Sequence, residues 1–134
     1  MKWQEFDAEV RKLGDKITAA KWSPDAVVGI VRGGVIPATV LANIFNVRKF
    51  YTMKVSHVGD ERRVKTFEPN VFEKKVLLVE DMLETGKSLK AAKEFLEAKG
   101  AEVKTACLYT VPRSAIVPDF SLKQIPEVIP FPWE

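Results

Sequence analysis

Three carboxylates and a small polar turn follow one short aliphatic segment of the chain. Residues 76–79 (VLLV) lead directly into Glu80 and Asp81, and residues 84–88 (ETGKS) come next. This turn opens a predicted helix, so its free backbone N–H groups, the helix dipole and two hydroxyls would converge on an anion such as a phosphate monoester. The neighbouring carboxylates would repel a phosphate unless they bind ribose hydroxyls or Mg²⁺ of the same ligand. The combination predicts a sugar phosphate site.

Two other interpretations of these residues are available. In one, the turn at 84–86 merely caps a helix and the acidic pair is a solvated turn. In the other, Gly86-Lys87-Ser88 belongs to a nucleotide-binding P-loop, but that motif needs a glycine where this chain has Asp81. The P-loop is therefore excluded, and no GxGxxG signature occurs.

A second candidate anion site follows an earlier aliphatic run. Residues 26–31 (AVVGIV) have the pattern of a strand covered on both faces, and the run stops at Arg32-Gly33-Gly34. Residues without side chains let a backbone approach a ligand, and arginine offers a bidentate fork for an oxyanion. The alternative is a glycine turn needed only for chain reversal.

Helical and strand patterns alternate around these two sites. Apolar spacing predicts helices over 3–20, from Pro37 to about residue 46, and from the 84–88 turn to Gly100; continuous or alternating apolar runs predict strands over 26–31, 47–55, 76–79 and 103–110. This alternation predicts an α/β fold, a parallel sheet flanked by helices. Because ligands bind beyond the carboxyl ends of such strands, both candidate sites should open on one edge of the sheet.

Two segments lack a sustained pattern. Residues 56–74 are polar and charged, and a connection of this length in a compact chain is usually functional or mobile. Residues 112–134 contain five prolines, which predicts extended coil with at most one edge strand.

Composition sets further limits. The 134 residues predict one domain, 1–134; 46% are hydrophobic and 29% charged, as in an ordinary globular protein. No apolar stretch approaches the length of a membrane span, so a cytoplasmic protein is expected. The single Cys107 and single His57 do not suffice for a zinc cage, and they are interpreted as a packing residue and a loop residue. A net charge of +3 suits anionic ligands without the excess typical of nucleic-acid binders.

Two runs resemble a known family. VLLVEDMLETGKSL is similar to the phosphoribosyl pyrophosphate (PRPP) signature of type I phosphoribosyltransferases, and VRGGVIPATVLAN is similar to the pyrophosphate loop of their xanthine-guanine and hypoxanthine branch. The resemblance covers about residues 24–113, with a fainter similarity at the C-terminal FPWE. It implies an α/β fold with a mobile hood loop at about 56–74 and a short C-terminal base-site segment at about 112–134.

The resemblance also assigns roles. Glu80 and Asp81 would hold the ribose hydroxyls, with Asp81 also touching Mg²⁺, and Glu84 would face the purine N7 as acid or base. The remaining assignments are the 5-phosphate cradle, Glu84, Thr85, Gly86, Lys87 and Ser88; the pyrophosphate loop, Arg32, Gly33 and Gly34, where members often have a cis peptide; and the hood cations, Arg62, Arg63 and Lys65.

The chain departs from the family pattern in three places. Glu84 stands where aspartate is usual, and Val111 stands where 6-oxopurine enzymes have a lysine that reads the purine O6. The aromatic residue that stacks on the purine is replaced by Val128 or Ile129, with Trp133 nearby. These three residues are the candidates for base binding.

The expected function is that of an Mg²⁺-dependent pentosyltransferase of purine salvage. PRPP and a purine base, most simply a 6-oxopurine, would give a nucleoside 5-monophosphate and pyrophosphate. The resemblance implies a homodimer or homotetramer, without membrane or nucleic-acid partners. The alternatives are a regulatory protein that binds PRPP or a nucleotide without catalysis, and a transferase for another nitrogenous base.

Overall fold

The computed structural model describes residues 1–134 as three helices and nine strands. The elements are α1 (Trp3–Ala19), β1 (Ala26–Ile30), α2 (Val35–Ile44), β2 (Phe50–Met53), β3 (Val55–Val58), β4 (Glu61–Val64), β5 (Lys75–Val79), β6 (Met82–Leu83), α3 (Lys87–Ala98), β7 (Glu102–Ala106), β8 (Tyr109–Thr110) and β9 (Lys123–Gln124). The three predicted helices are confirmed, with boundaries shifted by a few residues.

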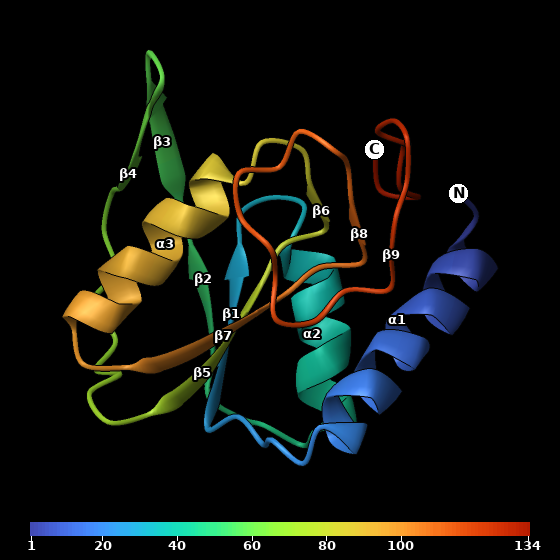
Figure 1. Cartoon of the computed structure of the whole chain (residues 1–134). Helices are drawn as coiled ribbons and strands as arrows, with labels where there is room; N and C mark the ends of the chain where they lie inside the picture. Colours follow the sequence, from blue (N-terminus) through green and yellow to red (C-terminus); the bar gives the residue numbers. More distant parts are fainter.

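The main sheet has four parallel strands in the order β2-β1-β5-β7. Helices α1 and α2 cover one face and α3 covers the other (Figure 1). The predicted apolar stripe of α1 is confirmed, because Phe6, Val10, Leu13 and Ile17 are all buried. A layered α/β architecture with a parallel sheet is therefore confirmed.

The predicted strand over 103–110 is interrupted. Strand β7 ends at Ala106, and the chain then joins a second, three-stranded parallel sheet in the order β6-β8-β9. Strand β5 makes the same change, since β6 follows it after Glu80 and Asp81. At this break Glu80 N–H donates to the Ala106 carbonyl at 3.0 Å, and Leu108 N–H donates to the Asp81 carbonyl at 3.0 Å.

The prediction that residues 56–74 form an irregular loop was partly wrong. Strands β3 and β4 pair as an antiparallel hairpin that projects from the main sheet (Figure 1), and residues 65–74 follow without regular structure. A two-residue turn joins the strands, and its first residue, Gly59, has φ of 61°. Glycine at this position is typical of tight hairpin turns, so Gly59-Asp60 was the signal for the hairpin.

Candidate functional site

The carboxyl ends of β1 and β5 open on one cavity of about 680 Å³. It is lined by Arg32, Gly33, Asp81, Trp133 and Glu134. The structure therefore brings together the loop after β1, one member of the acidic pair and the C-terminal segment. The prediction that both candidate sites lie at one edge of the sheet is confirmed.

The two glycines of the first loop are required by its packing. A Cβ atom on Gly33 would overlap the Asp81 carboxylate, and one on Gly34 would overlap the backbone carbonyl oxygen of Val79. The Val31–Arg32 peptide bond is cis. The loop therefore lies directly against Asp81 and the end of β5, and a side chain at either glycine would force these groups apart.

Glu80 and Asp81 lie at the break between the two sheets. Asp81 N–H donates to Glu80 Oε1 at 3.2 Å, and Met82 N–H donates to Asp81 Oδ1 at 2.6 Å. Burial, followed by the charge of Asp81, raises the pKa of Glu80 well above its ordinary value. Burial also raises the pKa of Asp81, and Glu134 adds to this. A bound cation or a pair of hydroxyl donors would relieve this strain between like charges.

The turn that precedes α3 forms a second, smaller cavity. Its volume is about 130 Å³, and its lining includes Glu80, Glu84, Thr85, Gly86 and Ser88. Gly86 has φ of 78°, in the left-handed region, and α3 begins at the next residue. The backbone N–H groups of the first helical turn have no carbonyl partner within the helix and face this end. The turn thus has the geometry of an anion cradle.

A segment of the C-terminal region supports this turn. Ala115 N–H donates to the Thr85 carbonyl at 2.8 Å, and a Cβ atom on Gly86 would overlap the Ile116 side chain. Arg113 Nη2 donates to Glu84 Oε2 at 2.8 Å, and Arg113 Nη1 lies 3.7 Å from Glu127 Oε2. Arg113 is not among the site residues predicted from the sequence. Its only signal was a charged residue two positions after the expected lysine position.

The hairpin cations do not reach either cavity. Arg63 is paired with Glu61 at 2.7 Å, and Arg62 donates to backbone carbonyls of its own hairpin. The hairpin does contact the turn before α3, because Lys87 Nζ lies 3.6 Å from Asp60 Oδ1. Its tip therefore lies near the start of α3.

Of the three base-binding candidates, only Trp133 lines the cavity. Val128 is exposed, and Ile129 packs against the core under α1. The Trp133 ring stacks on Phe131 with centroids 4.9 Å apart and meets Phe6 of α1 edge-on at 5.0 Å. Its Nε1 is buried and has no hydrogen-bond partner.

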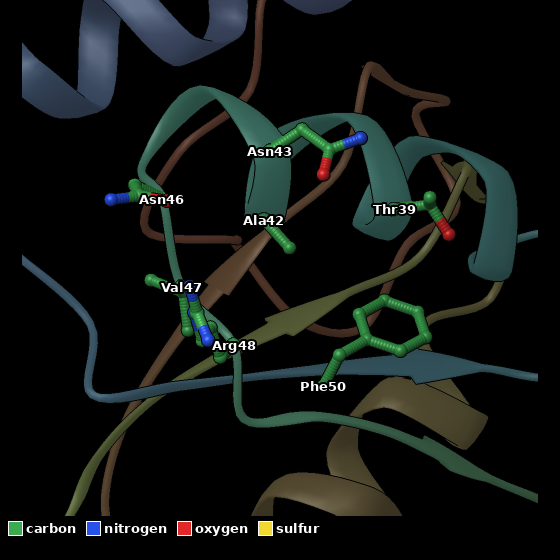
Figure 2. A pocket seen from close by; sticks show the side chains of 7 residues that line it. All are labelled: Thr39, Ala42, Asn43, Asn46, Val47, Arg48 and Phe50. Carbon is green, nitrogen blue, oxygen red and sulfur yellow. The ribbon is translucent and has the colours of Figure 1, made fainter.

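A further cavity, of about 320 Å³, lies at a different place in the fold. Its lining comes from α2 and the segment that leads to β2 (Figure 2): Thr39, Ala42, Asn43, Asn46, Val47, Arg48 and Phe50. None of the predicted site residues contributes to it. This cavity is therefore not part of the site at the carboxyl edge of the sheet.

The remaining titratable candidates lie outside the site. Cys107 is buried, and burial raises the pKa of its thiol to about 12. His57 is exposed on the hairpin. No group of three or more His, Cys, Asp or Glu side chains is placed to hold a metal ion, and no helix is long and apolar enough to cross a membrane.

The fold and the two cavities define an α/β protein with an anion cradle and an acidic pair at the carboxyl edge of a parallel sheet. The family model described as "Phosphoribosyl transferase domain" matches residues 2–134. The chain therefore belongs to the phosphoribosyltransferase family, whose members are pentosyltransferases.

Individual comparisons agree with this family. The chain is 30% identical over 135 residues to the hypoxanthine-guanine phosphoribosyltransferase of Lactococcus lactis subsp. lactis (strain IL1403), covering 92% of this chain and 74% of that protein. It is 33% identical over 92 residues to the orotate phosphoribosyltransferase of Helicobacter acinonychis (strain Sheeba), covering 69% of this chain and 44% of that protein. The crystal structure of the purine phosphoribosyltransferase from Pyrococcus horikoshii Ot3 superposes with a TM-score of 0.90 at 31% identity, covering 100% of this chain and 92% of that one.

Proposed function

We propose that this chain transfers the phosphoribosyl group of PRPP to a 6-oxopurine base, giving a nucleoside 5-monophosphate and pyrophosphate. The observation that carries this proposal is the grouping of the anion cradle, the acidic pair and the Arg32 loop along one sheet edge. The named activities of the hypoxanthine-guanine and purine relatives support the choice of base.

Each part of PRPP has a matching part of the site. The cradle before α3 would bind the 5-phosphate through backbone N–H groups and the hydroxyls of Thr85 and Ser88, with Gly86 shaping the turn and Lys87 adding charge. Glu80 and Asp81 would accept hydrogen bonds from the ribose hydroxyls. The fork of Arg32, beside Gly33 and Gly34, would bind pyrophosphate in the larger cavity, which Trp133 also lines.

Asp81 also fits a place in the ligand shell of Mg²⁺. Carboxylate oxygens are ligands that this ion prefers. Burial raises the pKa of both Glu80 and Asp81, so a bound cation would stabilise their ionised forms. No third carboxylate is grouped with this pair in a way that would complete a shell, so ligand oxygens and water would supply the rest. When bound, the ion would stabilise the negative charge that builds up on pyrophosphate.

In the transfer, N9 of the base forms a bond to C1 of the ribose while the bond from C1 to the pyrophosphate oxygen breaks. The electron pair of that bond leaves with pyrophosphate, and the proton on N7 passes to the Glu84 carboxylate. Arg32 would stabilise the leaving group. Residues 56–74 would cover the reacting carbon and exclude water. The contact of Lys87 with Asp60, at 3.6 Å, supports this role because it joins the hairpin tip to the start of α3.

A second candidate function is PRPP or nucleotide binding without catalysis. The observation that favours it is the position of Val128 and Ile129, neither of which lines the larger cavity, so that Trp133 is the single aromatic side chain available to a base there. In this case the site would bind ligands and serve a regulatory role.

Pyrophosphate release with PRPP, Mg²⁺ and a panel of bases separates these functions. We expect release with hypoxanthine, guanine or xanthine and little with adenine or orotate. Release with orotate or adenine in preference would overturn the choice of base. No release with any base, together with measurable PRPP binding, would identify the regulatory alternative.

Thr85→Val tests the 5-phosphate cradle. The change keeps the shape of the side chain and removes a hydroxyl that would donate to phosphate, so we expect PRPP affinity to fall about 10- to 100-fold, as for a lost charge-assisted hydrogen bond. Isothermal titration measures this loss, and the thermal midpoint should change little because Thr85 is exposed.

The matched control is Thr39→Val, an exposed threonine of α2 whose hydroxyl donates to the Val35 carbonyl. It should leave PRPP affinity unchanged. Equal affinities for both variants and the parent chain would place the 5-phosphate elsewhere.

A further inference from the structure

The residue at the expected lysine position cannot contact a base. Val111 is 2% exposed and belongs to the core under α1. Its N–H donates to the Leu83 carbonyl at 3.0 Å, which fixes the backbone there. If the site holds a 6-oxopurine, the donor to its exocyclic oxygen must come from another residue.

Arg113 lies beside Glu84, which lines the smaller cavity of the site. Its guanidinium connects the turn that carries Glu84 with the C-terminal segment that carries Glu127, at 2.8 and 3.7 Å. The three side chains are 45%, 56% and 77% exposed, and ion pairs this exposed contribute little to folding stability. Folding stability therefore depends little on this arrangement, and the exposed guanidinium is accessible to a ligand.

The donors of Arg113 are not exhausted by these contacts. A guanidinium has five N–H groups, and the two carboxylates engage only Nη1 and Nη2. The adjacent guanidinium and Glu84 carboxylate form a donor beside an acceptor. The edge of a 6-oxopurine presents the complement, because O6 accepts a hydrogen bond and the neighbouring N7–H donates one.

We propose that Arg113 is the specificity-determining residue that donates to O6 of the base while the adjacent Glu84 accepts from N7–H. This inference rests on the proposed function. A 6-aminopurine would turn its N6 donor toward the guanidinium donor, leaving both groups without an acceptor. The pair would therefore select 6-oxopurines although the expected lysine is absent.

Arg113→Met, a change that keeps most of the side-chain length and removes the donors, tests this role. We expect kcat/KM for hypoxanthine to fall about 10- to 100-fold, while kcat/KM for purine without a 6-substituent falls much less. Arg113→Lys, which keeps a cation, should recover part of the hypoxanthine rate. Arg11→Met, which removes a somewhat more exposed ion pair with Asp7 on α1, should change neither rate.

Affinities for inosine and adenosine monophosphates, measured by titration, test the same role without turnover. The parent chain should prefer the 6-oxo nucleotide, and Arg113→Met should reduce that preference. If Arg113→Met lowers kcat/KM equally for both bases and affinity equally for both nucleotides, Arg113 only anchors Glu84. If it lowers neither quantity, Arg113 has no role at the site. Either result overturns the inference. If the parent chain releases no pyrophosphate but Arg113→Met still reduces the nucleotide preference, the proposed reaction fails and this inference stands.

Discussion

Glu84→Gln is expected to lower kcat by about 10²- to 10⁴-fold, the usual loss when a general acid or base is removed. Glutamine keeps the length of the side chain and can still accept a hydrogen bond from Arg113, but it cannot take the N7 proton. PRPP affinity should remain nearly unchanged, because the phosphate contacts come from other residues of the turn. Steady-state pyrophosphate release with the preferred base, together with PRPP titration, measures both quantities.

Turnover of the Glu84→Asp variant shows whether the site works better with glutamate or with aspartate at this position. Aspartate is the usual residue of the family at this position, but its shorter side chain would move the carboxylate away from Arg113, now 2.8 Å from it. We therefore expect lower turnover than with glutamate. Glu94→Gln, which alters an exposed carboxylate of α3, serves as the control. Turnover that is indifferent to glutamate, glutamine and aspartate at position 84 would show that this carboxylate has no chemical role.

Asp81→Asn should weaken Mg²⁺-dependent PRPP binding by about 10- to 150-fold, corresponding to one lost charge-assisted contact of about 1.5–3 kcal/mol. At the same time the thermal midpoint of the free protein should be unchanged or higher, since the repulsion between two buried carboxylates is relieved. The amide oxygen can still accept the Met82 N–H bond. Undiminished PRPP affinity would contradict the assignment, and Asp15→Asn on the exposed side of α1 should affect neither property.

The acidic pair also predicts how stability varies with pH. Because the folded-state pKa values of Glu80 and Asp81 lie above their ordinary values, the folded protein binds more protons than the unfolded chain between those values. The contribution of the pair to the free energy of unfolding must then decrease as pH rises through that interval. Asp81→Asn should flatten this decrease, because it removes one carboxylate and the like charge beside Glu80. The free energy of unfolding of both proteins is measured by denaturant titration at several pH values from about 4 to about 8. This range starts near the ordinary carboxyl pKa values and extends about four pH units above them.

The elements that hold the site could be predicted because their patterns are local. A buried parallel strand such as 76–79 is a continuous aliphatic run, and the helix after it starts at a small polar turn. The order of the chain then places both loops at one edge of the sheet. No long-range contact had to be known for this step.

The contacts among loops could not be predicted in the same way. Arg113 meets Glu84 across 29 positions of the chain, and that meeting depends on where the chain leaves the main sheet after β7. The interruption of the strand after Ala106 has no period or breaker residue to announce it, since Cys107 and Leu108 are as apolar as their neighbours. The position of Ile129 likewise depends on packing against the core under α1 rather than on local preference, and Val128 beside it is left exposed.

The aromatic contacts of Trp133 have a consequence for the order in which the site is completed during synthesis. Phe6 and Trp133 lie 127 positions apart, and between them the ribosome makes every strand of both sheets. The cradle before α3 is supported by Ala115 and Ile116, so it can be completed only on a nascent chain that has emerged past residue 116. The part of the larger cavity that Trp133 lines cannot form until residue 133 has left the exit tunnel and packed against Phe6 of α1. All residues that form and support the phosphate cradle thus leave the ribosome before the residue that completes the larger cavity.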